Sequence, residues 1–162
     1  MNRTSQIAVV LPGVLLSTLT ACSKRDKVVM VEDDDPEMVA AIAKARSTLP
    51  HFWQVFDKKE RGESGFLLKV EIKDKRGSEF FWAIDLQRQD GKTMGTINND
   101  PNIVASVKLG DRIEIREADI ADWLYMRAGK MMGNATLKPL LKTMPAKEAA
   151  RLSLSVKPLR TP

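Results

Sequence analysis

The chain has 162 residues, a formal net charge of +5, one cysteine and one histidine. A lone cysteine excludes an internal disulfide, and a lone histidine excludes the multi-histidine sites that are typical of zinc proteins. The 141 residues after position 21 suffice for one domain with its own hydrophobic core.

The first element is an apolar run over residues 7–21, which follows Arg3 and is interrupted by Pro12 and Gly13. A membrane-spanning helix needs about 20 apolar residues, so this run is too short to span a bilayer. A basic start, an apolar stretch and then small residues are the layout of a secretory signal peptide. We therefore predict a cleaved signal peptide over residues 1–21.

The end of this run, Leu19-Thr20-Ala21-Cys22, resembles the bacterial lipobox. That resemblance implies cleavage before Cys22 and lipidation of this cysteine. Two or more acyl chains anchor a protein stably to a membrane, whereas one gives only marginal binding. Ser23 resembles the outer-membrane sorting signal, so we expect an envelope lipoprotein in the outer membrane, facing the periplasm. The alternative is a buried N-terminal helix with a core cysteine.

Residues 22–35 read as the lipidated cysteine and a tether, although Val28-Val29-Met30-Val31 could instead dock as an edge strand. The domain itself is expected over residues 36–154, and a flexible tail over residues 155–162. Asp35 followed by Pro36 is a strong helix start, with an N-cap residue before a proline at the first helical position.

Helical spacing places five residues of the first helix on one face, namely Met38, Ala41, Ile42, Ala45 and Leu49. Pro50 either breaks this helix or begins a second short one, HFWQVF. Two further helices are predicted near the end of the chain, one carrying Leu137, Leu140 and Leu141 and the other formed by AKEAARL.

Period-two alternation predicts strands in FLLKVEIK and EFFWAIDLQ, the second with Phe80, Trp82, Ile84 and Leu86 on one face. Asp90-Gly91 predicts a hairpin into KTMGTIN. Further strands are expected in RIEI and in a last hairpin around Ala128-Gly129, and a short helical piece after Pro101. The predicted fold is a single α+β domain with a curved antiparallel sheet of about five to six strands and flanking N-terminal and C-terminal helices.

Several motifs occur in order along the second half of the chain. They are Gly110-Asp111, Ile120 with Asp122-Trp123-Leu124-Tyr125, Gly129-Lys130 with Gly133-Asn134, and Thr136-Leu137. Together with ARSTLPHFW and GTINNDP, they resemble the bacterial family of domain of unknown function 2314, which is described as YegJ-like. The resemblance covers roughly residues 37–152 and implies a fold but no agreed activity. Leu124 and Ala135 depart from the pattern as packing changes.

No arrangement of side chains indicates catalysis, a metal or a cofactor. No serine lies in a Gly-x-Ser-x-Gly context, and His51 reads as a boundary residue of a short helix. Asp111, Asp119 and Asp122 could perform acid–base chemistry, but turns and local caps explain them more simply. The stretch Asn98-Asn99-Asp100 lacks the ligand spacing of a calcium loop.

The candidate binding residues are two aromatic side chains and a polar rim. Trp123 and Tyr125 share one face of their strand, as core residues or as part of a binding surface. Core packing explains them more simply. Asn98, Asn99, Gly133 and Asn134 are the residues that we expect at the polar rim.

Charge is unevenly distributed along the chain. Residues 77–126 carry five basic and nine acidic groups, whereas residues 127–162 carry eight basic groups and one acid, Glu148. A basic face of this kind attracts anionic lipid or lipopolysaccharide phosphate, although a solvated basic helix explains the pattern as well. Nucleic acid is not an expected partner outside the cytoplasm.

These features favour a non-enzymatic, lipid-anchored lipoprotein whose domain binds a protein or an envelope component. One alternative is a small periplasmic enzyme that uses carboxylates or amides on a cell-wall or small-molecule substrate. Another is an inhibitor or immunity-type protein directed against a periplasmic enzyme or toxin. The sequence leaves the oligomeric state open.

Overall fold

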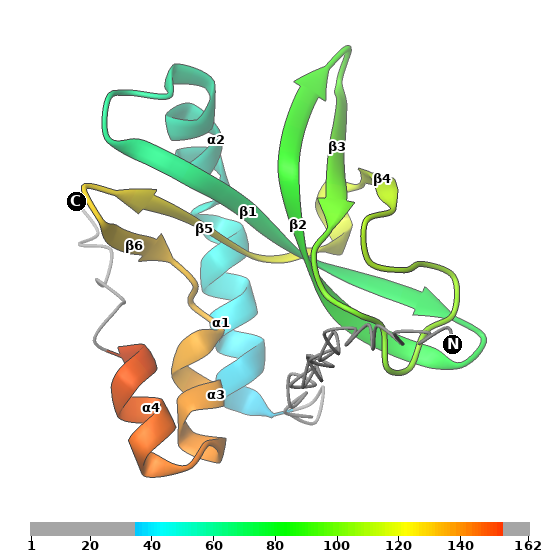
Figure 1. Ribbon diagram of the computed structural model, residues 1–162, viewed down its shortest axis with the longest axis vertical. Coiled ribbons are helices and arrows are strands. Elements are labelled where there is room, and N and C mark those ends of the chain that lie inside the picture. Colours follow the sequence, from blue (N-terminus) through cyan, green and yellow to red (C-terminus); the bar gives the residue numbers. More distant parts are fainter. Residues whose placement is uncertain (1–34, 154–162) are drawn as a thin grey trace, which may run out of the picture.

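The computed structural model describes residues 35–153. The predicted signal peptide, Cys22 and the C-terminal tail lie outside these residues. The described part is an α+β domain with one open antiparallel sheet, as the alternation and turn signals predicted (Figure 1).

The sheet has six strands in the order β4-β3-β2-β1-β5-β6, so β4 and β6 form its edges. Its centre is β1, in which Leu68 lies opposite Ala83 of β2 and Trp123 of β5. The strands are β1 (Glu63–Asp74), β2 (Gly77–Gln89), β3 (Lys92–Ile97), β4 (Arg112–Ile115), β5 (Ile120–Arg127) and β6 (Lys130–Gly133).

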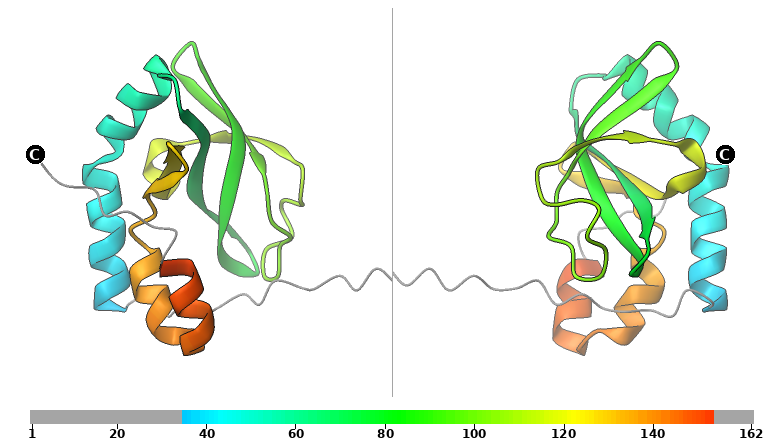
Figure 2. Two further views of the ribbon diagram at one scale, coloured as in Figure 1. Left: turned by 60° about the vertical axis from the view of Figure 1, so that its left-hand side comes forward. Right: turned by 90° about the vertical axis from the view of Figure 1, so that its right-hand side faces the viewer.

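Four α-helices flank the sheet, namely α1 (Pro36–Ser47), α2 (Leu49–Lys58), α3 (Leu137–Thr143) and α4 (Ala146–Ser153), and a short 3-10 helix, η1 (Glu117–Asp119), precedes β5. The helices α1 and α2 run along one side of the sheet, α3 packs beside α1, and α4 beside α3 (Figure 2). No helix among the described residues is both long and apolar enough to cross a membrane.

The start of α1 agrees with the sequence prediction. The Asp35 carboxylate caps it by accepting hydrogen bonds from the backbone N–H groups of Glu37 and Met38, at 2.7 and 3.4 Å. Pro50 lies at the second position of α2 and therefore begins a helix rather than only ending one. Proline is tolerated there because the first-turn N–H groups have no partner within the helix.

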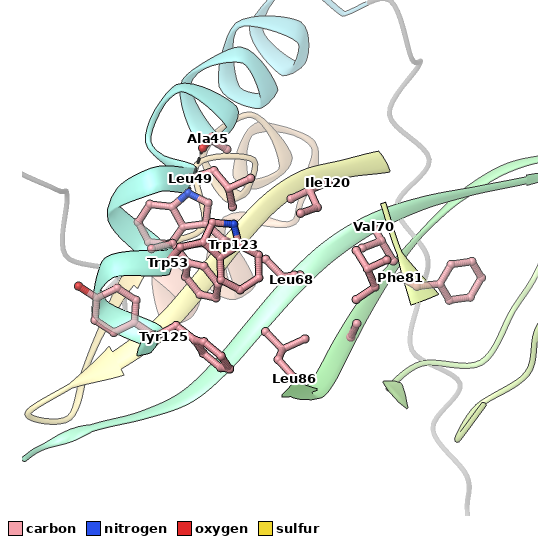
Figure 3. Close-up of a cluster of buried hydrophobic side chains, with 14 of the residues drawn as sticks. Ala45, Leu49, Trp53, Leu68, Val70, Phe81, Leu86, Ile120, Trp123 and Tyr125 are labelled. Atoms are coloured by element: carbon pink, nitrogen blue, oxygen red, sulfur yellow. Dashed lines mark hydrogen bonds between the residues drawn. The ribbon is translucent and has the colours of Figure 1, made fainter. Parts of the chain in front are cut away.

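The core lies between α2 and the sheet. From α2, Phe52, Trp53, Val55 and Phe56 are buried. They meet Leu68, Phe81, Leu86 and two aromatic residues of β5, Trp123 and Tyr125 (Figure 3). Burial of each large apolar side chain contributes about 1.5–3 kcal/mol, so this cluster dominates the stability of the domain.

The set of β2 residues on the buried face of the sheet differs from the sequence prediction. Phe81, Ala83 and Leu86 are buried, whereas Phe80 and Trp82 are only half-buried on the opposite face. Both alternating sets are apolar, so periodicity could not choose between them. A bulge at Asp85, where φ is +50°, then brings Leu86 onto the same face as Ala83.

The helical piece expected after Pro101 is absent, and residues 98–111 form an irregular connection from β3 to β4. Two carboxylates of the β1–β2 hairpin hold this connection. Glu79, buried at the start of β2, accepts hydrogen bonds from the backbone N–H groups of residues 102–104. Asp74 accepts from those of Ala105 and Ser106, at 2.6 and 3.1 Å.

These hydrogen bonds stabilise the ionised carboxylates. Burial alone would raise the pKa of Glu79, but the backbone donors of Ile103 and Asn102 outweigh burial and hold the pKa below its ordinary value. Backbone N–H groups, foremost that of Ala105, likewise lower the pKa of Asp74. Both groups therefore contribute stability while ionised, and this contribution is lost as the pH falls.

We predict that Glu79→Gln lowers the free energy of unfolding by about 1–3 kcal/mol at neutral pH, since charge-assisted hydrogen bonds are replaced by weaker ones. The pKa of Glu79 is lower in the folded protein, so the difference from wild type is complete above about pH 5 and shrinks as the pH falls below about 4. Urea unfolding at several pH values measures it. Glu114→Gln, at an exposed ion pair with Lys92, is the control and should change little. A difference that grows in acid contradicts the assignment.

Candidate functional site: a groove between α1 and α3

A groove with a volume of about 520 Å³ lies between α1, α3 and the end of the β5–β6 hairpin. This volume is within the range of about 300–1,000 Å³ that is usual for ligand pockets. Its apolar lining includes Ala40, Ala41 and Ala45 from α1, Trp123 from β5, Ala135, and Leu137, Pro139 and Leu141 from α3. The groove is therefore large enough to accept a small ligand or a short peptide segment.

The space exists because α1 presents alanines to α3. Their methyl groups are too short to fill the distance between the two helices, while contacts at the C-terminal end of α1 hold it in place. The indole N–H of Trp123 donates to the Ala45 carbonyl oxygen at 2.9 Å (Figure 3), and the Arg46 guanidinium donates to the Ile120 carbonyl oxygen at 2.8 Å. This wall of the groove is thus fixed directly to β5.

The other wall is positioned by a buried carboxylate. One oxygen of Asp122 accepts hydrogen bonds from the backbone N–H and the hydroxyl of Thr136, both at 2.7 Å. Its other oxygen accepts from the backbone N–H of Trp123 at 2.8 Å. The Lys69 ammonium group on β1 donates to the Thr136 hydroxyl oxygen at 3.1 Å. Because Thr136 immediately precedes α3, this network fixes the start of that helix.

Burial governs the ionisation of this network. It raises the pKa of the Asp122 carboxyl, while the hydrogen bonds from Thr136 lower it in part. Burial also lowers the pKa of Lys69, and the nearby Asp122 carboxylate opposes that change. Asp122 and Thr136 are each only 1% exposed. Asp122 lies under the lining of the groove with its oxygens engaged by Thr136 and Trp123, so the network is a structural junction between the sheet and α3.

Gly133 allows β6 to lie directly on Trp123. Its φ is +85°, and a Cβ atom there would come within 2.3 Å of the Trp123 carbonyl oxygen. Only glycine fits this conformation and this contact. The next residue, Asn134, continues the turn with φ +57° and donates its backbone N–H to the same oxygen at 2.8 Å.

The rim of the groove is basic. Lys44 and Lys138 are exposed and have no ion-pair partner among residues 35–153, whereas Lys142 is paired with Glu37 across the groove. Two uncompensated ammonium groups therefore flank an apolar floor. Such a surface suits an anion that also carries apolar groups.

The structure brings three of the six sequence-predicted binding residues to this groove, namely Trp123, Gly133 and Asn134. The exposed aromatic patch considered from the sequence is absent, because Trp123 is 1% and Tyr125 0% exposed. Both rings pack in the hydrophobic core, which is the simpler of the two interpretations that the sequence offered. The Tyr125 hydroxyl has no hydrogen-bond partner among the described residues.

Asn98 and Asn99 lie away from the groove, after β3. The Asn99 side-chain oxygen accepts a hydrogen bond from the Trp82 backbone N–H at 2.9 Å, and Asn98 donates its own N–H to the Trp82 carbonyl oxygen at 2.8 Å. These two contacts replace strand pairing where β3 ends. The rim predicted from the sequence is therefore divided between two places.

The remaining polar candidates have local roles. His51 is exposed on α2, and its ring centroid lies 6.3 Å from that of Trp123. Asp111 accepts from the Lys108 N–H in a turn, and Asp119 pairs with Arg116 at 2.7 Å. The part of the chain that the structure describes holds no group of three or more acidic, histidine or cysteine side chains that could bind a metal ion.

Sequence reasoning missed Lys44, the alanine wall and the role of Lys69. Lys44 belongs to the first helix and therefore to a different part of the chain from the basic C-terminal region. A carboxylate inside the apolar run IADWLY was the one available signal, because a buried acid in a strand requires nearby donors.

Comparison with known proteins gives a family match over all the residues that the structure describes. The family described as "Uncharacterized protein conserved in bacteria (DUF2314)" matches residues 35–155. The uncharacterized protein YegJ of Escherichia coli K12 is 39% identical over 119 residues, which are 74% of this chain and 76% of YegJ. A putative ankyrin repeat protein of Neisseria meningitidis serogroup B is 26% identical over 126 residues, 73% of this chain but only 50% of that protein. No solved structure matches.

Proposed function

The chain belongs to the DUF2314 family of uncharacterized bacterial proteins, and we propose that it is a lipid-anchored envelope lipoprotein whose domain binds a protein or an anionic envelope component in the α1–α3 groove. The anchor is proposed from Cys22 in its lipobox-like context. The binding role is proposed from the shape, lining and charge of the groove.

The observation that carries the proposal is the pairing of an apolar floor with uncompensated lysines. Leu141 and the alanines of α1 offer apolar area, which favours binding in proportion to the area removed from water. Lys44 and Lys138 add attraction for a negative group at the rim. An acidic segment of a partner protein with apolar side chains, or an anionic lipid, has both properties.

The alternative of a carboxylate enzyme has less support. The buried carboxylates of Asp122 and Glu79 accept hydrogen bonds from backbone N–H groups and hold α3 and the β3–β4 connection in place. A general acid or base must instead reach a substrate proton. An inhibitor of a periplasmic enzyme would be one form of the binding role that we propose.

The groove can be tested by site-specific photo-crosslinking of the lipoprotein in living cells. A benzophenone amino acid at Ala40, which lines the groove, should yield an adduct of discrete added mass. The same amino acid at Val39 is the matched control, because Val39 is 51% exposed on α1 but lies outside the groove lining. We expect the adduct at position 40 to fall severalfold with Lys138→Glu, since the substitution reverses a rim charge.

Equal adducts at positions 39 and 40, or none with added mass at position 40, would contradict a ligand in the groove. An adduct at position 40 that is insensitive to Lys138→Glu would contradict recognition of an anionic group. Mass spectrometry of the adduct separates a protein partner from a lipid.

Lipidation has its own test. We expect Cys22→Ser to abolish labelling with a fatty-acid analogue and cleavage by the lipoprotein route, because thiol acylation needs this sulfur. Fractionation of the envelope and the labelling gel are the measurements. The anchor proposal fails if the variant stays processed and membrane-bound with unchanged acyl labelling.

A further inference from the structure

The chain just before α1 has a composition that matches the groove. Residues 28–31 are Val-Val-Met-Val, and residues 32–34 are Glu-Asp-Asp. An apolar stretch followed by acids is the complement of an apolar floor with a lysine rim. This segment lies outside the family match, which begins at residue 35.

The position of α1 places the groove within reach of this segment. Asp35 caps α1, and Glu37, in the first turn, already lines the groove. The wall formed by α1 extends from Glu37 to Thr48, about 16 Å at a rise of 1.5 Å per residue. An extended chain covers up to about 3.3–3.6 Å per residue, so residues 28–34 can turn back at Asp35 and run along the whole wall.

Charge complementarity favours the acidic residues 32–34 over residues 154–162 as the part of the chain that meets the lysine rim of the groove. The ion pair between Glu37 and Lys142 shows that an acid near the start of α1 can meet a lysine of α3. Lys44 and Lys138 remain without such a partner among residues 35–153. Residues 154–162 carry Lys157 and Arg160 and no acid, so the rim would repel them.

We propose that residues 28–31 of the same chain occupy the α1–α3 groove, with the acids of residues 32–34 against its lysine rim. The segment is then an internal competitor, which must leave before an external ligand binds. Occupation of the groove is inferred from the groove lining and the sequence of residues 28–34, whereas the competition rests on the proposed function above. An intramolecular ligand has a high effective concentration, so even weak docking raises the apparent dissociation constant of a partner.

Paramagnetic relaxation measures this occupation in the full-length chain in lipid nanodiscs. The proposed acylation leaves Cys22, the one native cysteine, without a free thiol, so Met30→Cys alone carries the nitroxide label while the anchor is kept. We expect the methyl signals of Ala40, Ala41 and Leu141 in the groove to be lost, and that of Leu109 to persist. Leu109 is 50% exposed in the β3–β4 connection and serves as the internal control.

A label at Val156→Cys is the matched control in the other terminal segment, and it should leave the groove signals intact. Adding Val29→Asp and Val31→Asp to the Met30 sample should restore those signals. Groove signals that persist with the Met30 label overturn the proposal. The proposal is also overturned if the groove signals are lost only when nitroxide-labelled chains are mixed with chains that carry no nitroxide. That result would place residues 28–31 of a second copy in the groove.

Photo-crosslinking at position 40 separates this inference from the proposed function. If the segment competes with a ligand, Val29→Asp with Val31→Asp should raise the ligand adduct severalfold, and an unchanged yield would overturn the competition. Paramagnetic loss without any ligand adduct in either variant would leave the self-docking standing and refute the proposed function. A ligand adduct without paramagnetic loss would support the proposed function and refute the self-docking.

Discussion

A buried carboxylate at the start of α3 is the constraint on which the groove depends. Asp122 lies in the middle of an apolar strand, and burial of a charge is costly unless donors surround it. Thr136 supplies its backbone N–H and its hydroxyl, and Lys69 completes the network from β1. Since these donors come from both the sheet and the residue before α3, their geometry determines where α3 can lie.

The opposite wall depends on Trp123, the neighbour of Asp122 in β5. Its indole N–H holds the end of α1, and its carbonyl oxygen receives the turn at Gly133 and Asn134. Two consecutive residues of one strand therefore position both helices that form the groove. The alanines of α1 leave the space between them unfilled, and the lysines of both helices surround it.

Local signals in the sequence predicted most of the fold. The Asp35 cap, the Asp90-Gly91 hairpin and the alternating strands depend on neighbours within a few residues, and the structure confirms them. The facing of β2 was predicted wrongly because Phe80 and Phe81 are equally apolar, and the bulge at Asp85 has no clear signature in the sequence.

The groove could not be predicted in the same way, because its contacts join distant parts of the chain. Trp123 and Ala45 are 78 residues apart, and the lysines of the rim come from α1 and α3. Trp123 and Tyr125 of β5, the aromatic candidates from the sequence, are both buried in the hydrophobic core. Trp123 holds the end of α1 and the turn at Gly133 and Asn134, whereas Tyr125 packs against other aromatic rings of the core.

Hydrogen exchange in Asp122→Asn tests most directly whether this carboxylate positions α3. We expect the amides of α3 (Leu137–Thr143) to lose protection by about ten- to a hundredfold, because a weakened buried hydrogen bond costs roughly 1–3 kcal/mol, while the amides of the β1–β2 pair keep their protection. Asp119→Asn, at a surface ion pair, should leave both unchanged. Unaltered protection of α3 in Asp122→Asn, or an equal loss throughout the domain, would contradict the account.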